Sequence, residues 1–231
     1  MYKKEFKTGT FYHGDCLEVF KELKTEEFDL AVIDPPYTMT KFGKSCRPNY
    51  MEYSEDNLFD LPLPNLKLWL KNSFETLKSP SHFYVFCNKN DIVKFINEAE
   101  NQGFKLHNII TMIKDTKMPN RWYLKYTEFI LFFRKGKAFP INDMTSRDYV
   151  DVVMPKTSNG KIHITQKPLN LIEKLITNSS KEGEIVFDPF AGSGTTAVAA
   201  LKNKRKWVCI EVDKTYFDLA CERILEAEKN V

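Results

Sequence analysis

The 231-residue sequence contains no apolar run of about 18 or more residues, so we expect no membrane-spanning helix. Its first residues, MYKKEFKTG, contain no apolar core of the kind found in secretory signals. The five cysteines are odd in number and widely spaced, and no CxxC or Cys/His cluster is present. A disulfide framework and a zinc site are therefore not expected. These absences predict a protein of the reducing cytoplasm that needs no metal.

Neither positive nor negative charge is in large excess, because the net charge is only +3. The basic residues are nevertheless unevenly distributed. Residues 114–137 contain seven basic and two acidic residues, and residues 38–51 contain three basic residues and no acid. Aromatic residues lie among them: Phe42, Tyr50, Trp122, Tyr123 and Tyr126. This mixture is typical of surfaces that follow phosphates and stack on bases, although solvated lysine-rich loops have a similar composition.

Strand and helix patterns alternate along most of the chain, which predicts an α/β fold in a single domain, 1–231. The predicted strands are 11–13, 30–34, 82–87, 106–113, 128–133, 184–188 and 207–212. The predicted helices are 17–23, 61–77, 92–102, 169–177, 195–204 and 213–229. No crossover helix is evident between the fourth and fifth strands. We therefore expect a mostly parallel sheet with a C-terminal antiparallel pair.

The segment DLAVIDPPYT combines a buried type of strand with a rigid corner. Pro35 and Pro36 cannot donate to a strand ladder, so the strand must stop after Asp34. Ligands of open α/β sheets bind at such carboxyl ends. The Asp34 carboxylate and the Pro35 carbonyl oxygen could accept the two hydrogens of an exocyclic base amine, which would free its lone pair for attack. Tyr37 could stack on the base. A strand-ending turn with a capping Asp would explain the tetrapeptide equally well.

A second strand, EIVFD, is followed by the turn PFAGSG and then by a helix. Glu211 ends the next strand, 19 residues after Gly192. This spacing is that of an acid that binds a ribose diol after a nucleotide-type glycine turn. The turn lacks the third glycine of the dinucleotide motif and the lysine of a P-loop. Asp188 at the strand end favours a cationic ligand over a phosphate, and S-adenosylmethionine, with its sulfonium and ammonium groups, fits.

Four stretches resemble, in their order, the β class of bacterial DNA amino-methyltransferases of type II restriction–modification systems. They are FYHGDCLEVFKEL, DLAVIDPPY, HITQKPLNLIEKLI and VFDPFAGSGTTAVAALKNKRKWVCIEVD. The resemblance covers nearly the whole chain, and the DPPY half precedes the cofactor-binding half. It implies a Rossmann-like, S-adenosylmethionine-dependent methyltransferase fold with a permuted order of motifs. It also implies action on a base flipped out of double-stranded DNA.

The resemblance further implies roles for individual residues. The catalytic corner would comprise Asp34, Pro35, Pro36 and Tyr37. Cofactor-binding positions would be Asp15, Cys16, Asp34, Lys167, Pro168, Asp188, Phe190, Ala191, Gly192, Ser193, Gly194, Thr195, Glu211 and Val212. Within this set, Glu211 would hold the ribose and Val212 would lie beside the adenine, as would Asp15 and Cys16. Lys167 and Pro168 would close over the methionine end. Glu128, within YTEF, would line the target-base pocket.

Three segments are assigned to the DNA by the same reasoning. Residues 136–162 are polar and rich in Pro and Gly, and we expect a small target-recognition insert there. Residues 38–58 show no clear period, and their position beside the DPPY corner suggests a lid. Together with residues 114–127, they are predicted to be DNA-facing loops. Further partners implied by the resemblance are a cognate restriction endonuclease, a second methyltransferase, and a second copy of the chain in a homodimer.

The resemblance favours adenine N6 as the target, because DPPY accompanies adenine in that class and SPPY accompanies cytosine N4. Other functions stay open from the residues alone. They are cytosine-N4 methylation, methylation of RNA or of a protein amide nitrogen, and the role of a non-catalytic DNA-binding subunit. Intact Asp34, Tyr37, Gly192, Gly194 and Glu211 argue against the last of these.

Overall fold

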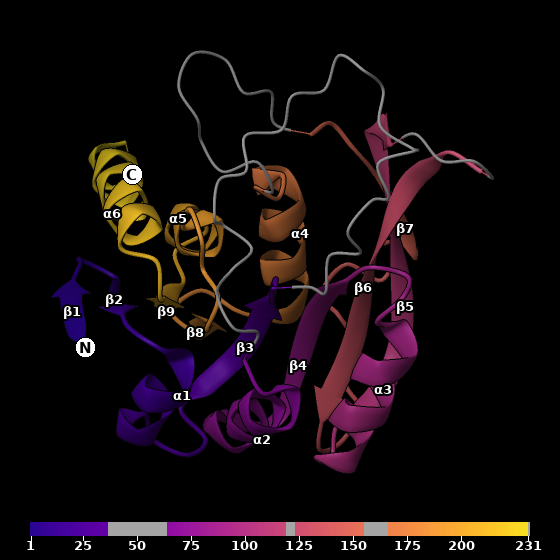
Figure 1. The fold of residues 1–231 in the computed structure, drawn as a ribbon, viewed down its shortest axis with the longest axis horizontal. Helices are drawn as coiled ribbons and strands as arrows, with labels where there is room; N and C mark the ends of the chain where they lie inside the picture. Colours follow the sequence, from indigo (N-terminus) through magenta and orange to yellow (C-terminus); the bar gives the residue numbers. More distant parts are fainter. Residues whose placement is uncertain (37–63, 119–122, 155–165, 231) are drawn as a thin grey trace, which may run out of the picture.

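The computed structural model describes residues 1–36, 64–118, 123–154 and 166–230, and these residues build one nine-stranded sheet between two layers of helices (Figure 1). The strand order is β1-β2-β9-β8-β3-β4-β6-β5-β7. The strands are β1 Tyr2–Glu5, β2 Gly9–His13, β3 Phe28–Ile33, β4 Leu77–Cys87, β5 Lys105–Met118, β6 Lys125–Lys135, β7 Tyr149–Val152, β8 Ile185–Asp188 and β9 Lys206–Glu211.

Helices cover both faces of the sheet. Those on one face are α4 Leu169–Ser179, α5 Thr195–Lys202 and α6 Lys214–Lys229, and those on the other are α1 Cys16–Val19, α2 Leu66–Thr76 and α3 Ile92–Asn101. A short 3-10 helix, η1 Phe20–Glu22, continues α1. Successive side chains of a strand point to opposite faces of the sheet, so the central strands contribute apolar residues to the core on each face. In β3, Leu30 and Val32 pack in the core under α4–α6, whereas Ala31 and Ile33 pack in the core over α1–α3.

The pairing pattern confirms the α/β fold and corrects one detail of it. The pairs β2–β9, β9–β8, β8–β3, β3–β4 and β5–β7 are parallel. Antiparallel pairing occurs in the middle of the chain, where β6 lies between β4 and β5, and at the edge between β1 and β2. The predicted antiparallel pairing of residues 106–113 with 128–133 is confirmed by β5 and β6. This pair lies in the middle of the chain and not at its C-terminal end, where β8 and β9 are parallel neighbours joined by the crossover helix α5.

Most predicted elements are confirmed, with shifted bounds. The closing unit β8–α5–β9–α6 is found as predicted, and Asp213 caps α6 by accepting from the backbone N–H groups of Thr215 and Tyr216. Asp15 likewise caps α1 by accepting from Leu17 N at 2.7 Å. The helix predicted to span 61–77 is shorter, because Asn65 is its N-cap and β4 begins directly at Leu77.

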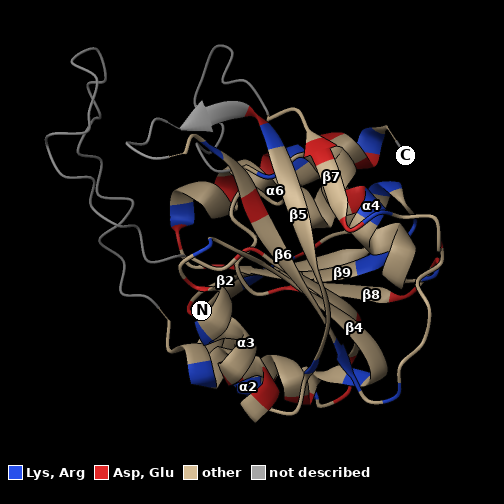
Figure 2. Cartoon of the chain, turned by 90° about the vertical axis from the view of Figure 1, so that its right-hand side faces the viewer, with Lys and Arg blue, Asp and Glu red and all other residues tan. Residues whose placement is uncertain are grey.

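The two central strands are longer than predicted, which changes the reading of residues 114–127. Strand β5 continues to Met118 and β6 begins at Lys125, so the ends of this segment are strand and not loop. Figure 2 shows that charged residues lie toward the ends of β5 and β6, whereas the middle of these strands is uncharged. Whether this hairpin faces DNA stays a prediction.

The predicted insert at 136–162 contributes to the sheet. Its strand β7 pairs in parallel with β5 through Thr111 and Tyr149, although no strand was predicted there. Asn142 ties the segment to α4, since its amide donates to the carbonyl oxygens of Thr177 and Ser180. The described part of the insert is therefore integrated into the domain, and its role in target recognition stays a prediction. No helix within the described ranges is long and apolar enough to cross a membrane.

Candidate active site

The predicted site residues gather at one edge of the sheet, where several strands reach the same end. The parallel strands β9, β8 and β3 end at Glu211, Asp188 and Ile33, and Asp34 follows directly. Strand β6 runs in the opposite direction, so its beginning brings Glu128 to this edge. Carboxylates from separate parts of the sequence are thus assembled at the carboxyl ends of the parallel strands.

The glycine turn between β8 and α5 needs residues without a side chain. Gly192 and Gly194 have φ values of 51° and 74°, in the left-handed region that only glycine enters at low cost. A Cβ atom on Gly194 would also lie 3.0 Å from Ala220 Cβ of α6. Ala191 N donates to Ile210 O at 2.9 Å, which fastens the turn to β9. The turn is therefore compact and held on two sides.

Asp188 lies buried inside this turn. Its carboxylate accepts from Phe190 N at 3.0 Å and from the Thr196 hydroxyl at 2.6 Å. Burial raises the pKa of Asp188 to about 7, and these hydrogen bonds oppose the rise. Among the residues that the structure describes, no cation pairs with it. A positively charged ligand group would supply the missing counter-charge.

Glu211 closes the other side of the turn. Its two carboxylate oxygens accept from Gly192 N at 2.7 Å and from Asp213 N at 2.8 Å. Burial raises the pKa of Glu211, and hydrogen bonds from these backbone groups lower it in part. Each oxygen has a second lone pair with which it can accept from a ligand hydroxyl. This donor-rich, acid-bearing turn fits a nucleoside with a cationic group.

The remaining cofactor positions line the neighbouring strand ends. Gly14 N donates to Glu211 O at 3.0 Å, so the start of α1 lies beside the end of β9. Cys16 is buried, and burial raises the pKa of its thiol to about 12, which makes it an apolar wall and not a nucleophile. Val212 is half exposed. Phe190 packs edge-on against Trp69 of α2 at 5.5 Å.

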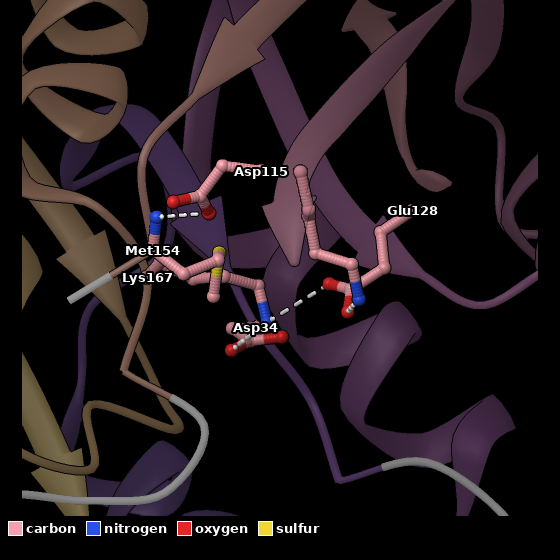
Figure 3. A network of polar contacts seen from close by, with 6 residues as sticks. Asp34, Asp115, Glu128, Met154 and Lys167 are labelled. Atoms are coloured by element: carbon pink, nitrogen blue, oxygen red, sulfur yellow. Dashed lines mark hydrogen bonds and ion pairs between the residues drawn. The ribbon is translucent and has the colours of Figure 1, made fainter. Parts of the chain in front are cut away.

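A chain of alternating charges runs from the DPPY corner across β6 to β5 (Figure 3). Lys167 Nζ lies 2.7 Å from Asp34 Oδ2 and 3.6 Å from Glu128 Oε2. Lys114 Nζ in turn donates to Glu128 Oε1 at 2.8 Å. The Lys167 side chain is 7% exposed, and its ammonium lies 5.2 Å from the centre of the Phe86 ring. Four charged side chains from four separate segments thus form one partly buried cluster.

The pKa values in this cluster follow from its pairing. Burial alone would raise the pKa of Glu128, but Lys167 and Lys114 lower it by more, so the net shift is downward. Burial would lower the pKa of Lys167, but Asp34 and Glu128 raise it by more. Both side chains therefore keep their charges at neutral pH.

The structure brings Lys167 to the DPPY corner, where its ammonium donates to the Asp34 carboxylate. Its predicted place over the methionine end of the cofactor stays a prediction. Pro168 is buried and caps α4. Pro35 is buried and Pro36 is exposed, whereas Tyr37 and residues 38–58 lie outside the described residues.

Two residues of this region escaped the sequence analysis. Lys114 stands in a basic segment of the sequence, but it is a partly buried partner of Glu128. Arg223 of α6 donates through Nη1 to Ser193 O at 3.1 Å and to Thr195 Oγ1 at 3.0 Å. With its amide oxygen turned toward the guanidinium, Gln166 accepts from Arg223 Nη2 at 3.0 Å. The available signal was a charged residue directly beside the apolar stripe of α6, next to Ile224.

Comparison with known proteins identifies the family. Residues 28–222 match the family N6_N4_Mtase, described as DNA methylase. The chain belongs to this DNA methylase family. The match includes the DPPY corner, the charged cluster and the glycine turn. The name covers both N6 and N4 enzymes, so membership alone does not distinguish an adenine target from a cytosine target.

Type II methyltransferases are similar to this DNA methylase over nearly the whole length of the present chain. M2.DpnII of Streptococcus pneumoniae is 30% identical over 245 residues, which span 94% of this chain and 89% of the relative. M.HinfI of Haemophilus influenzae is 30% identical over 250 residues, spanning 96% of this chain and 70% of the relative.

Solved structures support the fold. The crystal structure of the M1.HpyAVI–SAM complex matches with a TM-score of 0.69 and 29% identity, covering 92% of this chain and 98% of that one. PvuII DNA methyltransferase, described as cytosine-N4-specific, matches with a TM-score of 0.72 over 97% of this chain and 92% of that one, at 18% identity. The second likeness concerns the fold alone. The fold is that of the S-adenosylmethionine-dependent DNA methyltransferases.

Proposed function

We propose that this DNA methylase transfers the methyl group of S-adenosylmethionine to the N6 amine of an adenine flipped out of duplex DNA. One observation carries the proposal: the acid of the DPPY corner, Asp34, follows β3 directly beside the strand that leads into the glycine turn. The charge of Asp34 contributes to the raised pKa of Asp188, which is a further sign that the two carboxyls are close. Methyl acceptor and methyl donor would therefore meet between them.

The glycine turn supports S-adenosylmethionine as the cofactor. When bound, it supplies an electrophilic methyl group on a sulfonium, which leaves as a neutral thioether once the methyl has been taken up by the amine. The buried Asp188 lacks a cationic partner among the described residues and would attract the positive methionine end. Glu211 would accept from the ribose hydroxyls while it holds Gly192. M1.HpyAVI, which is 29% identical, was crystallised with the same cofactor.

The DPPY corner supports transfer to an amine. Asp34 and the Pro35 carbonyl oxygen would accept the two hydrogens of the base amine and turn its lone pair toward the methyl group. Positioning of this kind accounts for much of the rate enhancement in transfer reactions. After transfer, the nitrogen carries one proton too many, and Asp34 is the acceptor that can pass this proton to solvent. Tyr37, which follows Pro36, is assigned to stacking on the base.

Adenine is proposed as the target because the acid form of the corner, Asp34 before Pro35, is the one that accompanies adenine in the family that the sequence resembles. The basic and aromatic hairpin tip between β5 and β6 supports contact with DNA, since Tyr123 is 89% exposed and Lys125 lies near it. A cognate restriction endonuclease and a homodimer are further proposals. They draw on the type II classification of M2.DpnII and M.HinfI and on the resemblance.

Nucleoside analysis by mass spectrometry tests the proposal directly. The protein is incubated with S-adenosylmethionine and long unmethylated duplex DNA, which is then digested to nucleosides. We expect N6-methyladenine, and we expect none with Asp34→Ala. N4-methylcytosine would contradict the adenine assignment, and methylation by Asp34→Ala at the wild-type rate would contradict the mechanism. An RNA substrate of matched sequence serves as the control for nucleic-acid type.

A further inference from the structure

The Lys167 ammonium is held between two carboxylates in a largely buried place. Its side chain is 7% exposed, whereas those of Asp34 and Glu128 are each 26% exposed. Burying an ammonium is costly unless charged partners compensate it, so this arrangement needs both carboxylates. Lys167 comes from the turn before α4, Asp34 from the end of β3, and Glu128 from the start of β6. Three elements therefore converge on one point charge.

We propose that Lys167 is a positioning residue for the methyl-transfer reaction. Its ammonium fixes the orientation of the Asp34 carboxylate. Glu128, which forms an ion pair with Lys114, holds Lys167 in place. The inference rests on the proposed function of Asp34 as the acceptor for the target amine. It assigns to Lys167 a task at the amine, in contrast to the cofactor task that its sequence segment suggested.

The chemistry of the acceptor gives the physical reason. A protonated carboxyl has one acceptor position fewer and carries a proton that would oppose the amine hydrogens. An ammonium at 2.7 Å from one oxygen stabilises the charged form and limits rotation of the carboxylate. Without the ammonium, Asp34 and Glu128 would face each other as like charges, and one of them would take up a proton at higher pH.

The other groups around Lys167 do not replace it. On β4, the Phe86 ring lies under the ammonium, and Cys87 is a buried thiol with a pKa raised to about 12 by burial and by Asp91 and Glu128. On β5, Lys114 contacts Glu128, whereas Asp115 accepts from Met154 N at 2.9 Å. On β8, Asp188 is a further acid that feels the charge of Asp34. Among the residues that the structure describes, Lys167 thus contacts both carboxylates.

A structural ion pair would also fit these contacts, so the test must separate structure from positioning. Lys135 provides a matched control, because it is another buried lysine at the opposite end of β6. Its ammonium donates to the carbonyl oxygens of Phe74 and Leu77, far along the strand from Glu128. Loss of Lys135 should reduce stability without changing the chemistry of the site.

The experiment measures single-turnover methyl transfer to long unmethylated duplex DNA as a function of pH. For Lys167→Met we expect a rate constant lower by about 100-fold. The acid limb of its pH–rate profile, where the rate falls as pH decreases, should move to higher pH by about one unit. Lys167→Arg keeps the charge with another geometry, so its acid limb should stay in place while its rate constant falls. In the double variant Lys167→Met/Glu128→Gln the like-charge contact is gone, so the limb should return toward that of the wild type.

Two measurements on the protein without DNA complete the test. Calorimetric binding of S-adenosylmethionine by Lys167→Met should stay within about threefold of the wild type, because the proposed task lies at the amine. Urea unfolding of the free variant should show a steeper loss of stability with rising pH than that of the wild type, whose own loss comes from Asp188, and Glu128→Gln should remove the excess.

Defined outcomes overturn the proposal. A Lys167→Met variant whose acid limb stays in place, or whose rate falls no further than that of Lys135→Met, would show a merely structural pair. Loss of cofactor binding would assign Lys167 to the cofactor instead. Failure of the proposed function looks different, because the unsubstituted protein would then form no N6-methyladenine, or Asp34→Ala would still methylate DNA.

Discussion

Asp188 and Thr196 are joined by a hydrogen bond of 2.6 Å inside the turn that connects β8 to α5. The threonine hydroxyl donates to a carboxyl whose pKa burial raises to about 7. Between its ordinary pKa of 3.8 and about 7, the folded protein keeps a proton that the unfolded chain has released. The free energy of unfolding should therefore decrease as pH rises through this interval, and the cost is complete above it.

The first prediction follows from this cost. Asp188→Asn replaces the charged group by a neutral one of the same shape, so the free protein should gain of the order of a few kcal/mol at pH 8 and little at pH 4. Affinity for S-adenosylmethionine should fall by at least about tenfold, because the counter-charge of the cationic ligand is removed. Urea unfolding and calorimetry measure the two effects. A variant that is destabilised at pH 8 and binds normally would contradict the assignment.

The second prediction concerns Gly194, whose φ of 74° and proximity to α6 exclude a side chain. Gly194→Ala should cost about 1–2 kcal/mol of backbone strain and push the turn away from Ala220, which weakens cofactor binding. Gly183→Ala is the matched control, because Gly183 has a φ of 83° but open space around its Cβ position. Both variants should lose stability, whereas only Gly194→Ala should lose cofactor affinity. Equal affinities would refute a special role of the turn.

The third prediction separates support of the turn from general stability. Arg223→Met removes the donors to Ser193 O and Thr195 Oγ1, so cofactor affinity should drop by about tenfold while the pH dependence of transfer stays unchanged. Arg205→Met is the control, because Arg205 is also buried but donates to Ser180. Isothermal titration calorimetry with S-adenosylmethionine measures the cofactor affinity of both variants. Equal losses of affinity would indicate that Arg223 acts only through stability.

The fourth prediction concerns the sheet. A Cβ atom on Gly9 would lie 2.3 Å from the Trp207 ring and 2.4 Å from its carbonyl oxygen. Since neither β2 nor the buried Trp207 can move away cheaply, Gly9→Ala should reduce the free energy of unfolding by about 1–3 kcal/mol. The cofactor should still bind below the denaturation midpoint, because Gly9 lies at the opposite end of β2 from the site. Denaturant titration with and without S-adenosylmethionine provides the measurement. Wild-type stability would contradict the close approach.

Much of the fold could be predicted because local patterns agree with it. The DPPY strand has Leu30, Ala31, Val32 and Ile33 buried on alternate faces, and its end is set by two prolines. The glycine turn and the closing helices were found from caps and spacing. Strand β7 was missed because it is four residues long, and its surrounding segment is polar. Its strand conformation depends on pairing with β5, which no local pattern reports.

The site could be predicted only in its local parts. Asp34, Asp188 and Glu211 were found because each ends a strand, and strand ends of parallel neighbours share an edge. The contact of Lys167 with Asp34 joins residues 133 positions apart, and it depends on how α4 packs on the sheet. The pairing of Lys114 with Glu128 depends in turn on the register of β5 and β6. Neither contact follows from composition or spacing.

The pairing of β2 with β9 also determines when the sheet can form during synthesis. Gly9 lies opposite Trp207, so one side of the second strand finds its neighbour only after most of the chain has been translated. Pairs of such high sequence separation form slowly, since a long loop must close before the contact brings any stabilisation. Strand β3 likewise waits for β8 on one side. The nascent chain therefore emerges from the ribosome with unpaired strand edges, and we expect its first compact intermediate to contain β4, β5 and β6, which are close in sequence.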